Sequence, residues 1–135
     1  MASPLLLVKN LIKYFRNPNS NFSFKDKWIK AVDGVTFEIY PGETVGIVGE
    51  SGCGKSTLGR TIVGLNKPDS GEIYFLGEDL LKMSEYSRKK LSKKMQIIFQ
   101  DPAGSLNPRR TIEETLMDPF SIHGLYEKSE RKEII

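Results

Sequence analysis

Alternating and unbroken apolar runs predict strands in the part of the chain ahead of residue 100. Val35, Phe37 and Ile39 alternate with polar residues, which is typical of a strand with one buried face. Residues 44–48, directly after the Pro41-Gly42 turn, form a nearly continuous apolar run that is typical of a strand buried in a parallel sheet. The predicted strands are 5–9, 28–40, 44–48, 72–76 and 95–99.

Helical spacing appears between and after these strands. Leu58, Ile62 and Leu65 lie at i, i+4 and i+7, which places them on one face of a helix over residues 56–65. Asp33-Gly34 predicts a turn or bulge within the strand that contains it. Further helices are expected at 84–94, 111–117 and 127–135, and the last of these ends without a capping residue, as if the chain were cut there. The order of elements indicates an α/β fold with antiparallel material at its start.

Composition narrows the class of protein only modestly. The chain has 135 residues, 39% hydrophobic and 27% charged, which is typical of one globular domain at most. Its net charge of +3 is too small to argue for nucleic-acid binding, so no nucleic-acid partner is expected. A single cysteine excludes a disulfide framework and indicates a reducing compartment. The apolar run 5–8 is too short for a signal peptide or a membrane span, which suggests a cytosolic protein or one held at a membrane by a partner.

One glycine-rich segment carries the strongest chemical signal. It fits the pattern G-x-x-x-x-G-K-[ST], whose backbone N–H groups surround a phosphate chain at the start of a helix. Lys55 is expected to reach the β- and γ-phosphates, and the Ser56 hydroxyl is expected to bind Mg²⁺. The alternative is an ordinary glycine turn, but a predicted strand before the motif and a helix starting at Lys55 favour the phosphate loop. The loop and its next residue are Gly49, Glu50, Ser51, Gly52, Cys53, Gly54, Lys55, Ser56 and Thr57.

Four segments in this order resemble the ATP-binding subunit of ABC transporters. They are residues 10–15, the strands of 31–43, the phosphate loop, and Gln96-Ile97-Ile98-Phe99-Gln100-Asp101-Pro102. The resemblance implies a P-loop NTPase (RecA-like) core with an N-terminal antiparallel β part. It implies ATP and Mg²⁺ as ligands, with a second ABC ATPase subunit and transmembrane permease subunits as partners. The protein would then work at the cytoplasmic face of the cell membrane. Its sequence would divide into the antiparallel β part at 1–43, the P-loop core through the glutamine loop at 44–110, and the start of the helical subdomain at 111–135.

A finer resemblance concerns the transported cargo. The beginning of the phosphate loop, the entry at 28–34, and the segment around Gln100 with 105–109 resemble the dipeptide/oligopeptide importer branch, which also includes nickel importers. A peptide cargo is therefore expected, with nickel or another substrate of the same branch as the alternative. In that family this subunit does not touch cargo, so no residue here identifies it.

The resemblance also implies residue roles. Phe15 would stack on adenine, with Tyr14 as the competing aromatic and a place in the core as the alternative role for Phe15. The backbone from Glu50 to Thr57 would surround the α- and β-phosphates, with Thr57 at the α-phosphate. Gln100 would bind Mg²⁺ and orient the attacking water. His123 is expected to be a surface or helix-end residue, and the basic run within 88–94 a solvated helix face.

Several groups that the family needs for hydrolysis do not occur in the sequence. There is no Leu-Ser-Gly-Gly signature, no apolar run ending in Asp-Glu, and no switch histidine after one. The resemblance therefore covers only the front of the cassette, truncated at the start of its helical subdomain. The family relation predicts an ATPase, yet this chain alone is expected to have little activity. Two interpretations remain open: a fragment of a working importer ATPase, and a short remnant that binds nucleotide at most. A different P-loop ATPase or kinase is disfavoured by the Gln100 segment.

Overall fold

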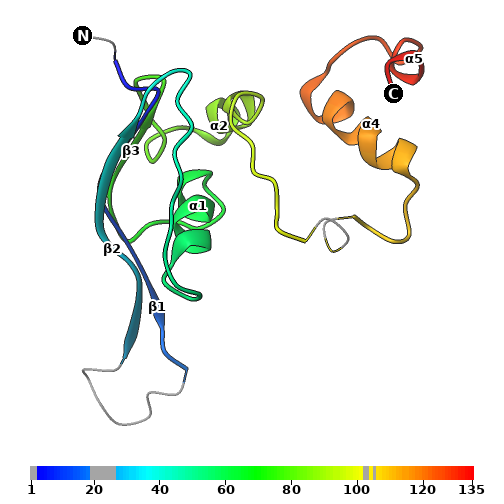
Figure 1. Cartoon of the computed structure of the whole chain (residues 1–135). Coiled ribbons are helices and arrows are strands. Elements are labelled where there is room, and N and C mark those ends of the chain that lie inside the picture. The colour runs from blue at the N-terminus through cyan, green and yellow to red at the C-terminus, as the bar shows by residue number, and fades with distance from the viewer. Residues whose placement is uncertain (1–2, 19–26, 102–103, 105) are drawn as a thin grey trace. The chain divides into compact units, whose positions relative to one another are not determined.

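The computed structural model describes residues 3–18, 27–101, 104 and 106–135. Pro102 and Ser105, which contribute to the resemblance around Gln100, lie outside these residues. The polar, turn-rich composition of residues 17–21 also predicts a loop, and part of that segment lies outside the described residues as well. The chain forms two compact units, Met1–Ile97 and Ile98–Ile135. Their relative placement is not determined, so each unit is described by itself (Figure 1).

The first unit is built on an antiparallel sheet with the strand order β2-β1-β3-β4. The long strands β1 (Leu6–Arg16) and β2 (Trp28–Ile39) pair with each other, and β1 also pairs with β3 (Ser70–Phe75). The short β4 (Glu78–Asp79) completes the sheet after a turn at Gly77. The predicted strands at 28–40 and 72–76 are confirmed, and β1 extends well beyond the predicted 5–9.

Three register shifts interrupt the β1–β2 pair, the last of them between Lys13 and Tyr14. The register passes from Leu11 opposite Val35 to Lys13 opposite Val32, so β2 holds one extra residue at the predicted Asp33-Gly34 position, where Gly34 has φ +71°. A second bulge lies in β1 around Asn10, which has φ +46° and whose amide donates to Thr36 Oγ1 at 2.8 Å. This bulge lets β1 continue past the polar Lys9-Asn10 pair, where the sequence predicted its end.

The core of the first unit lies between the sheet and helix α1 (Lys55–Ile62), which runs beside the strands in Figure 1. Leu58 is buried in the core and Ile62 packs against it, as predicted, whereas Leu65 lies beyond the helix and is exposed. Helix α2 (Glu85–Leu91) follows, with the Ser84 hydroxyl accepting from the Ser87 amide as its N-cap. The buried apolar residues are Leu6, Val8, Leu11, Val32, Leu58, Ile73, Phe75 and Leu80.

The predicted parallel strands at 44–48 and 95–99 are not formed. Neither segment belongs to a strand, and Val48 and Ile98 are 95% and 96% exposed. A strand exists only through hydrogen bonds to a neighbouring strand, and no strand in the described part of the chain pairs with either segment. An apolar run alone was therefore an insufficient signal.

The second unit contains α4 (Ile112–His123) and the short α5 (Arg131–Ile134). Helix α4 starts with a capping box between Thr111 and Glu114 and ends at Gly124, which adopts the left-handed conformation. It extends past the predicted end at 117 and contains Pro119, and His123 is its last residue, as expected. Helix α5 covers only four residues of the predicted 127–135. Among the helices described, none is long and apolar enough to cross a membrane.

Candidate functional site

The glycine-rich loop leads directly into α1, and the helix begins at Lys55, as predicted. Gly54 is the N-cap residue with φ +99°, and Gly52 has φ +82°. Glycine is the residue that adopts these angles without strain. Because Gly54 has no side chain, the first amides of α1 receive no side-chain cap, and the first turn contains no acidic residue. The positive end of the helix is thus available to an anion.

The loop is packed tightly against strand β2. A Cβ atom on Gly54 would lie 1.9 Å from the Ala31 carbonyl oxygen, well inside the distance at which atoms overlap. A Cβ atom on Gly49 would lie 2.7 Å from Cys53 Sγ. Gly54 therefore requires glycine both for space and for its backbone angle, whereas a side chain at Gly49 would first have to displace the Cys53 thiol. No pattern in the sequence indicated that the Ala31 carbonyl lies against Gly54.

Lys55 lies over the loop that precedes it. Its Nζ donates to the carbonyl oxygens of Gly49 and Glu50 at 2.7 and 2.6 Å, and Cys53 Sγ is 3.5 Å away. These bonds hold the ammonium group at the loop, where it can approach a bound phosphate chain. Ser56 is exposed and Thr57 half-buried in the first turn of the same helix. The donor set fits a phosphate chain, and the Ser56 hydroxyl can add one oxygen ligand to a Mg²⁺ ion.

Phe15 and Tyr14 have different environments near the end of β1. Phe15 pairs with Ile29 and is 39% exposed. Tyr14 is half-buried, and its hydroxyl donates to Asp33, which raises the pKa of Tyr14. Lys30 Nζ lies 5.3 Å from the Tyr14 ring centroid and donates to Asp33 at 3.1 Å. Because Tyr14 is engaged in this network, Phe15 is the better candidate for stacking on a base.

Asp69 joins the end of β1 to the segment that leaves α1, a contact that no sequence pattern indicated. One carboxylate oxygen accepts from the Tyr14 amide at 2.6 Å, and the other accepts from Lys13 Nζ at 3.4 Å. The hydrogen bond from the Tyr14 backbone amide lowers the pKa of Asp69 most, and the contact with Lys13 lowers it further. Lys13 Nζ also lies 5.3 Å from the centroid of the Phe15 ring. Asp69 is separated in the sequence from Tyr14 by 55 positions and from Lys13 by 56, so no local pattern could have paired it with either residue.

Gln100 is exposed and belongs to the second unit. The structure does not place it relative to the phosphate loop, so its predicted role at Mg²⁺ stays a prediction. The basic residues of the predicted solvated face, Arg88, Lys89, Lys90, Lys93 and Lys94, are all exposed.

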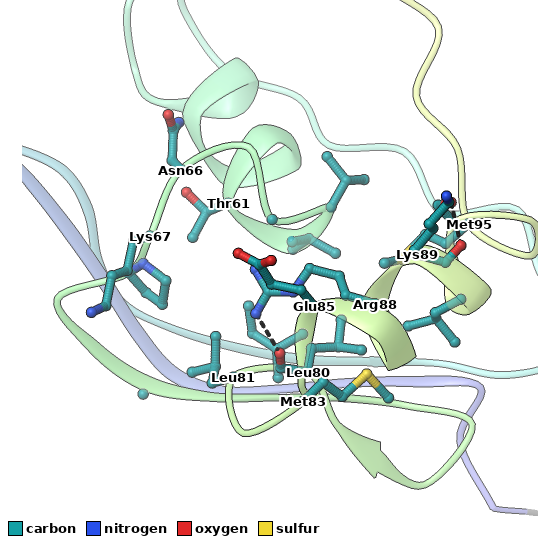
Figure 2. Close-up of a pocket in the computed structure, with 18 of the residues that line it drawn as sticks. Thr61, Asn66, Lys67, Leu80, Leu81, Met83, Glu85, Arg88, Lys89 and Met95 are labelled. Atoms are coloured by element: carbon teal, nitrogen blue, oxygen red, sulfur yellow. Dashed lines mark hydrogen bonds between the residues drawn. The ribbon is translucent and has the colours of Figure 1, made fainter. Parts of the chain in front are cut away.

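A cavity of about 880 Å³ lies in the first unit at the end of α1 away from the loop. Thr61, the segment after α1, β3 and α2 line it, and Figure 2 shows Arg88 reaching from α2 to the Leu80 carbonyl at 3.0 Å. The phosphate-loop residues do not contribute to its lining. The cavity and the loop are therefore separate features of this unit.

Comparison with known proteins identifies relatives that share these features. The oligopeptide transport ATP-binding protein AppF of Bacillus subtilis is 48% identical over 130 residues, which are 96% of this chain and 40% of the relative. The dipeptide transport ATP-binding protein DppF of Escherichia coli is 41% identical over 133 residues, which are 98% of this chain and 40% of the relative. The chain thus spans about 40% of the length of these curated relatives.

Solved structures and a family pattern agree with these relatives. A dimeric structure of the ATP-binding cassette MJ0796 in a post-hydrolysis state, bound to ADP and Pi, aligns with a TM-score of 0.72 at 27% identity. The alignment covers 95% of this chain and 53% of that one, which confirms the predicted cassette fold. The sequence pattern of the family described as ABC transporter matches residues 32–135. Because that match covers most of the chain, the protein belongs to the ABC transporter family.

Proposed function

We propose that the first unit binds ATP with the loop 49–57 around its phosphates and Phe15 against its adenine. The observation that carries this proposal is the loop itself, which ends at Gly54 in the left-handed conformation and leads directly into α1 at Lys55. Lys55 would move from the carbonyls of its own loop toward the β- and γ-phosphates. Thr57 would lie at the α-phosphate, and Ser56 would bind Mg²⁺, which supplies charge neutralisation when bound.

In the complete protein this binding would serve transport. We propose a role as the ATP-hydrolysing subunit of a peptide importer, because relatives more than 40% identical over nearly the whole chain are named as oligopeptide and dipeptide transport ATP-binding proteins. The partners would be a second cassette and permease subunits, with the protein at the cytoplasmic face of the membrane. Gln100 would bind Mg²⁺ and orient the attacking water there.

The 135-residue chain would bind ATP but hydrolyse it poorly. Phosphoryl transfer depends on charges and water positioned on all sides of the γ-phosphate. Beyond Gln100 the sequence offers no signature motif, no Asp-Glu strand end and no histidine after one. The proposal therefore separates binding, which the loop supports, from hydrolysis, which needs further groups.

Calorimetric titration of the chain with MgATP, combined with a phosphate-release assay, tests both parts. Lys55→Ala removes a charge-assisted contact to phosphate and is expected to weaken binding by about 10- to 100-fold. Lys67→Ala is the control, because Lys67 is an exposed lysine beyond the other end of α1 and should leave affinity unchanged. Equal affinity of the Lys55→Ala variant and the parent would refute the binding site. Steady phosphate release above that of the Lys55→Ala variant would refute the proposed lack of hydrolysis.

A further inference from the structure

Lys13 occupies a specific position between a carboxylate and an aromatic ring. Its Nζ lies 3.4 Å from Asp69 Oδ1 and 5.3 Å from the centroid of the Phe15 ring. The Lys13 side chain is only 16% exposed, whereas the Phe15 residue remains 39% exposed. Because the two residues are two positions apart on β1, they share one side of the strand. The ammonium group therefore contacts a ring that still reaches solvent.

Asp69 fixes this arrangement from a second direction. Its backbone amide donates to the Ile12 carbonyl at 2.9 Å, and its carboxylate accepts from the Tyr14 amide at 2.6 Å. Asp69 is thus bonded to β1 on both sides of Lys13. These bonds hold the carboxylate that attracts Lys13 Nζ in a defined place beside the strand. The position of the ammonium group over Phe15 follows from the backbone rather than from the lysine side chain alone.

We propose that Lys13, held by Asp69, is a positioning residue for the adenine of bound ATP and acts through Phe15. This inference rests on the proposed stacking of adenine on Phe15. A cation over one face of the ring attracts its π-electrons and holds the ring in place. The opposite face is then preorganised for an electron-rich base, and less side-chain freedom is lost when the base binds. Lys13 thus contributes to affinity for the base and not to affinity for the phosphates.

The contribution can be measured by comparing ATP with inorganic tripolyphosphate, which lacks the base. Calorimetric titration of the full chain should show Lys13→Met weakening ATP binding by about two- to fivefold, the range expected for an exposed cation–π contact. Tripolyphosphate affinity should stay unchanged. Lys13→Arg keeps a cation that stacks on aromatic rings and should retain the affinity for ATP.

Lys9→Met is the matched control. Lys9 lies on the same strand, and its Nζ is 5.8 Å from the centroid of the Tyr74 ring, so the substitution removes an equivalent contact away from Phe15. ATP affinity should not change in this variant. Thermal melting of each variant establishes that it is folded at the titration temperature. If Lys13→Met is unfolded, the Lys13→Arg variant decides, because weakened ATP binding in that folded variant would overturn the inference.

Phe15→Ala separates this inference from the proposed function. If Phe15→Ala weakens ATP binding and adding Lys13→Met to it has no further effect, Lys13 acts through Phe15. If Phe15→Ala weakens ATP binding but Lys13→Met does not, the inference is wrong and adenine stacking stands. If Lys13→Met weakens tripolyphosphate binding as much as ATP binding, Lys13 acts on phosphate or on the fold, and the inference is again wrong. If the parent binds tripolyphosphate but Phe15→Ala leaves ATP affinity unchanged, the proposed stacking fails and the inference fails with it.

Discussion

The two units of the chain are ordered by different kinds of contact. In the first unit, side chains far apart in the sequence, such as Leu11 and Ile73, are both fully buried in one core. In the second unit, no residue that the structure describes is buried. Its helix α4 is instead defined by near neighbours: the Thr111–Glu114 capping box, the Gly124 C-cap, and Arg110 on Asp118. A unit can therefore be ordered by a shared core or by local contacts at the ends of a helix. We expect these two kinds of order to respond differently to mutation.

Removal of the same side chain from each unit tests this difference most strongly. Leu11→Ala leaves a cavity at a residue that is 0% exposed and should lower the free energy of unfolding by about 2–5 kcal/mol. Leu116→Ala in α4 affects a residue that is 47% exposed and should change the free energy of unfolding by no more than about 0.5 kcal/mol. Urea titration followed by fluorescence of the single tryptophan, Trp28, and by circular dichroism measures both. Equal effects would contradict the contrast between a core and a surface helix.

Two left-handed glycines give a second, smaller contrast. Gly54→Ala adds a Cβ atom that would overlap the Ala31 carbonyl oxygen at a residue with φ +99°. It should cost about 2 kcal/mol or more, since the backbone angle alone costs about 1–2 kcal/mol, and it should abolish ATP binding. Gly124→Ala meets no atom within 4 Å at φ +60°, so only the backbone cost of about 1 kcal/mol remains. Thermal melts and ATP titrations compare them, and unimpaired ATP binding by Gly54→Ala would contradict the tight packing of the loop on β2.

Features encoded by consecutive residues were predictable from the sequence. The phosphate loop is a continuous segment, so its glycines and the helix start at Lys55 could be identified without knowing any partner. The Asp33-Gly34 bulge was predictable for the same reason. The start of α4 at Thr111 likewise depends on residues within one helical turn.

Features that depend on distant partners could not be predicted. The segments 44–48 and 95–99 have strand-like composition, but strand formation requires hydrogen bonds from a neighbour that no local pattern supplies. The Ala31 carbonyl beside Gly54 and the Asp69 carboxylate beside Lys13 also arise from the tertiary arrangement. Residues 67–71 have the composition of a loop, so no sequence pattern indicated a structural role for Asp69, although it fixes the strand that carries Phe15. Sequence patterns thus predicted the glycine-rich loop and one candidate aromatic, but not the contacts that hold that aromatic.

The smallest expected contrast concerns one carboxylate in each unit. The pKa of Asp69 is lowered first by the Tyr14 amide, and that of Asp118 by Arg110. A carboxylate whose pKa is lower in the folded state adds stability above the unfolded value of about 3.9, and this stability is lost as the pH falls through the folded pKa. Asp69→Asn and Asp118→Asn should therefore each lower the melting temperature at pH 7, and each difference from the parent should shrink as the pH falls below about 4.

Salt should separate these two carboxylates. Asp118 depends on an exposed ion pair, with Arg110 Nη1 2.5 Å from its carboxylate and side chains 37% and 46% exposed, so about 1 M salt should reduce the effect of Asp118→Asn. Asp69 depends first on a backbone amide held in place by the β-sheet, and the effect of Asp69→Asn should change less with salt. Melting followed by Trp28 fluorescence reports the unit of Asp69, and helical circular dichroism reports all the helices, of which α4 is the longest described. Equal salt sensitivity would mean that the Lys13 charge, and not the Tyr14 amide, is the main cause of the lowered pKa of Asp69. The two units would then differ only in whether they contain a buried core.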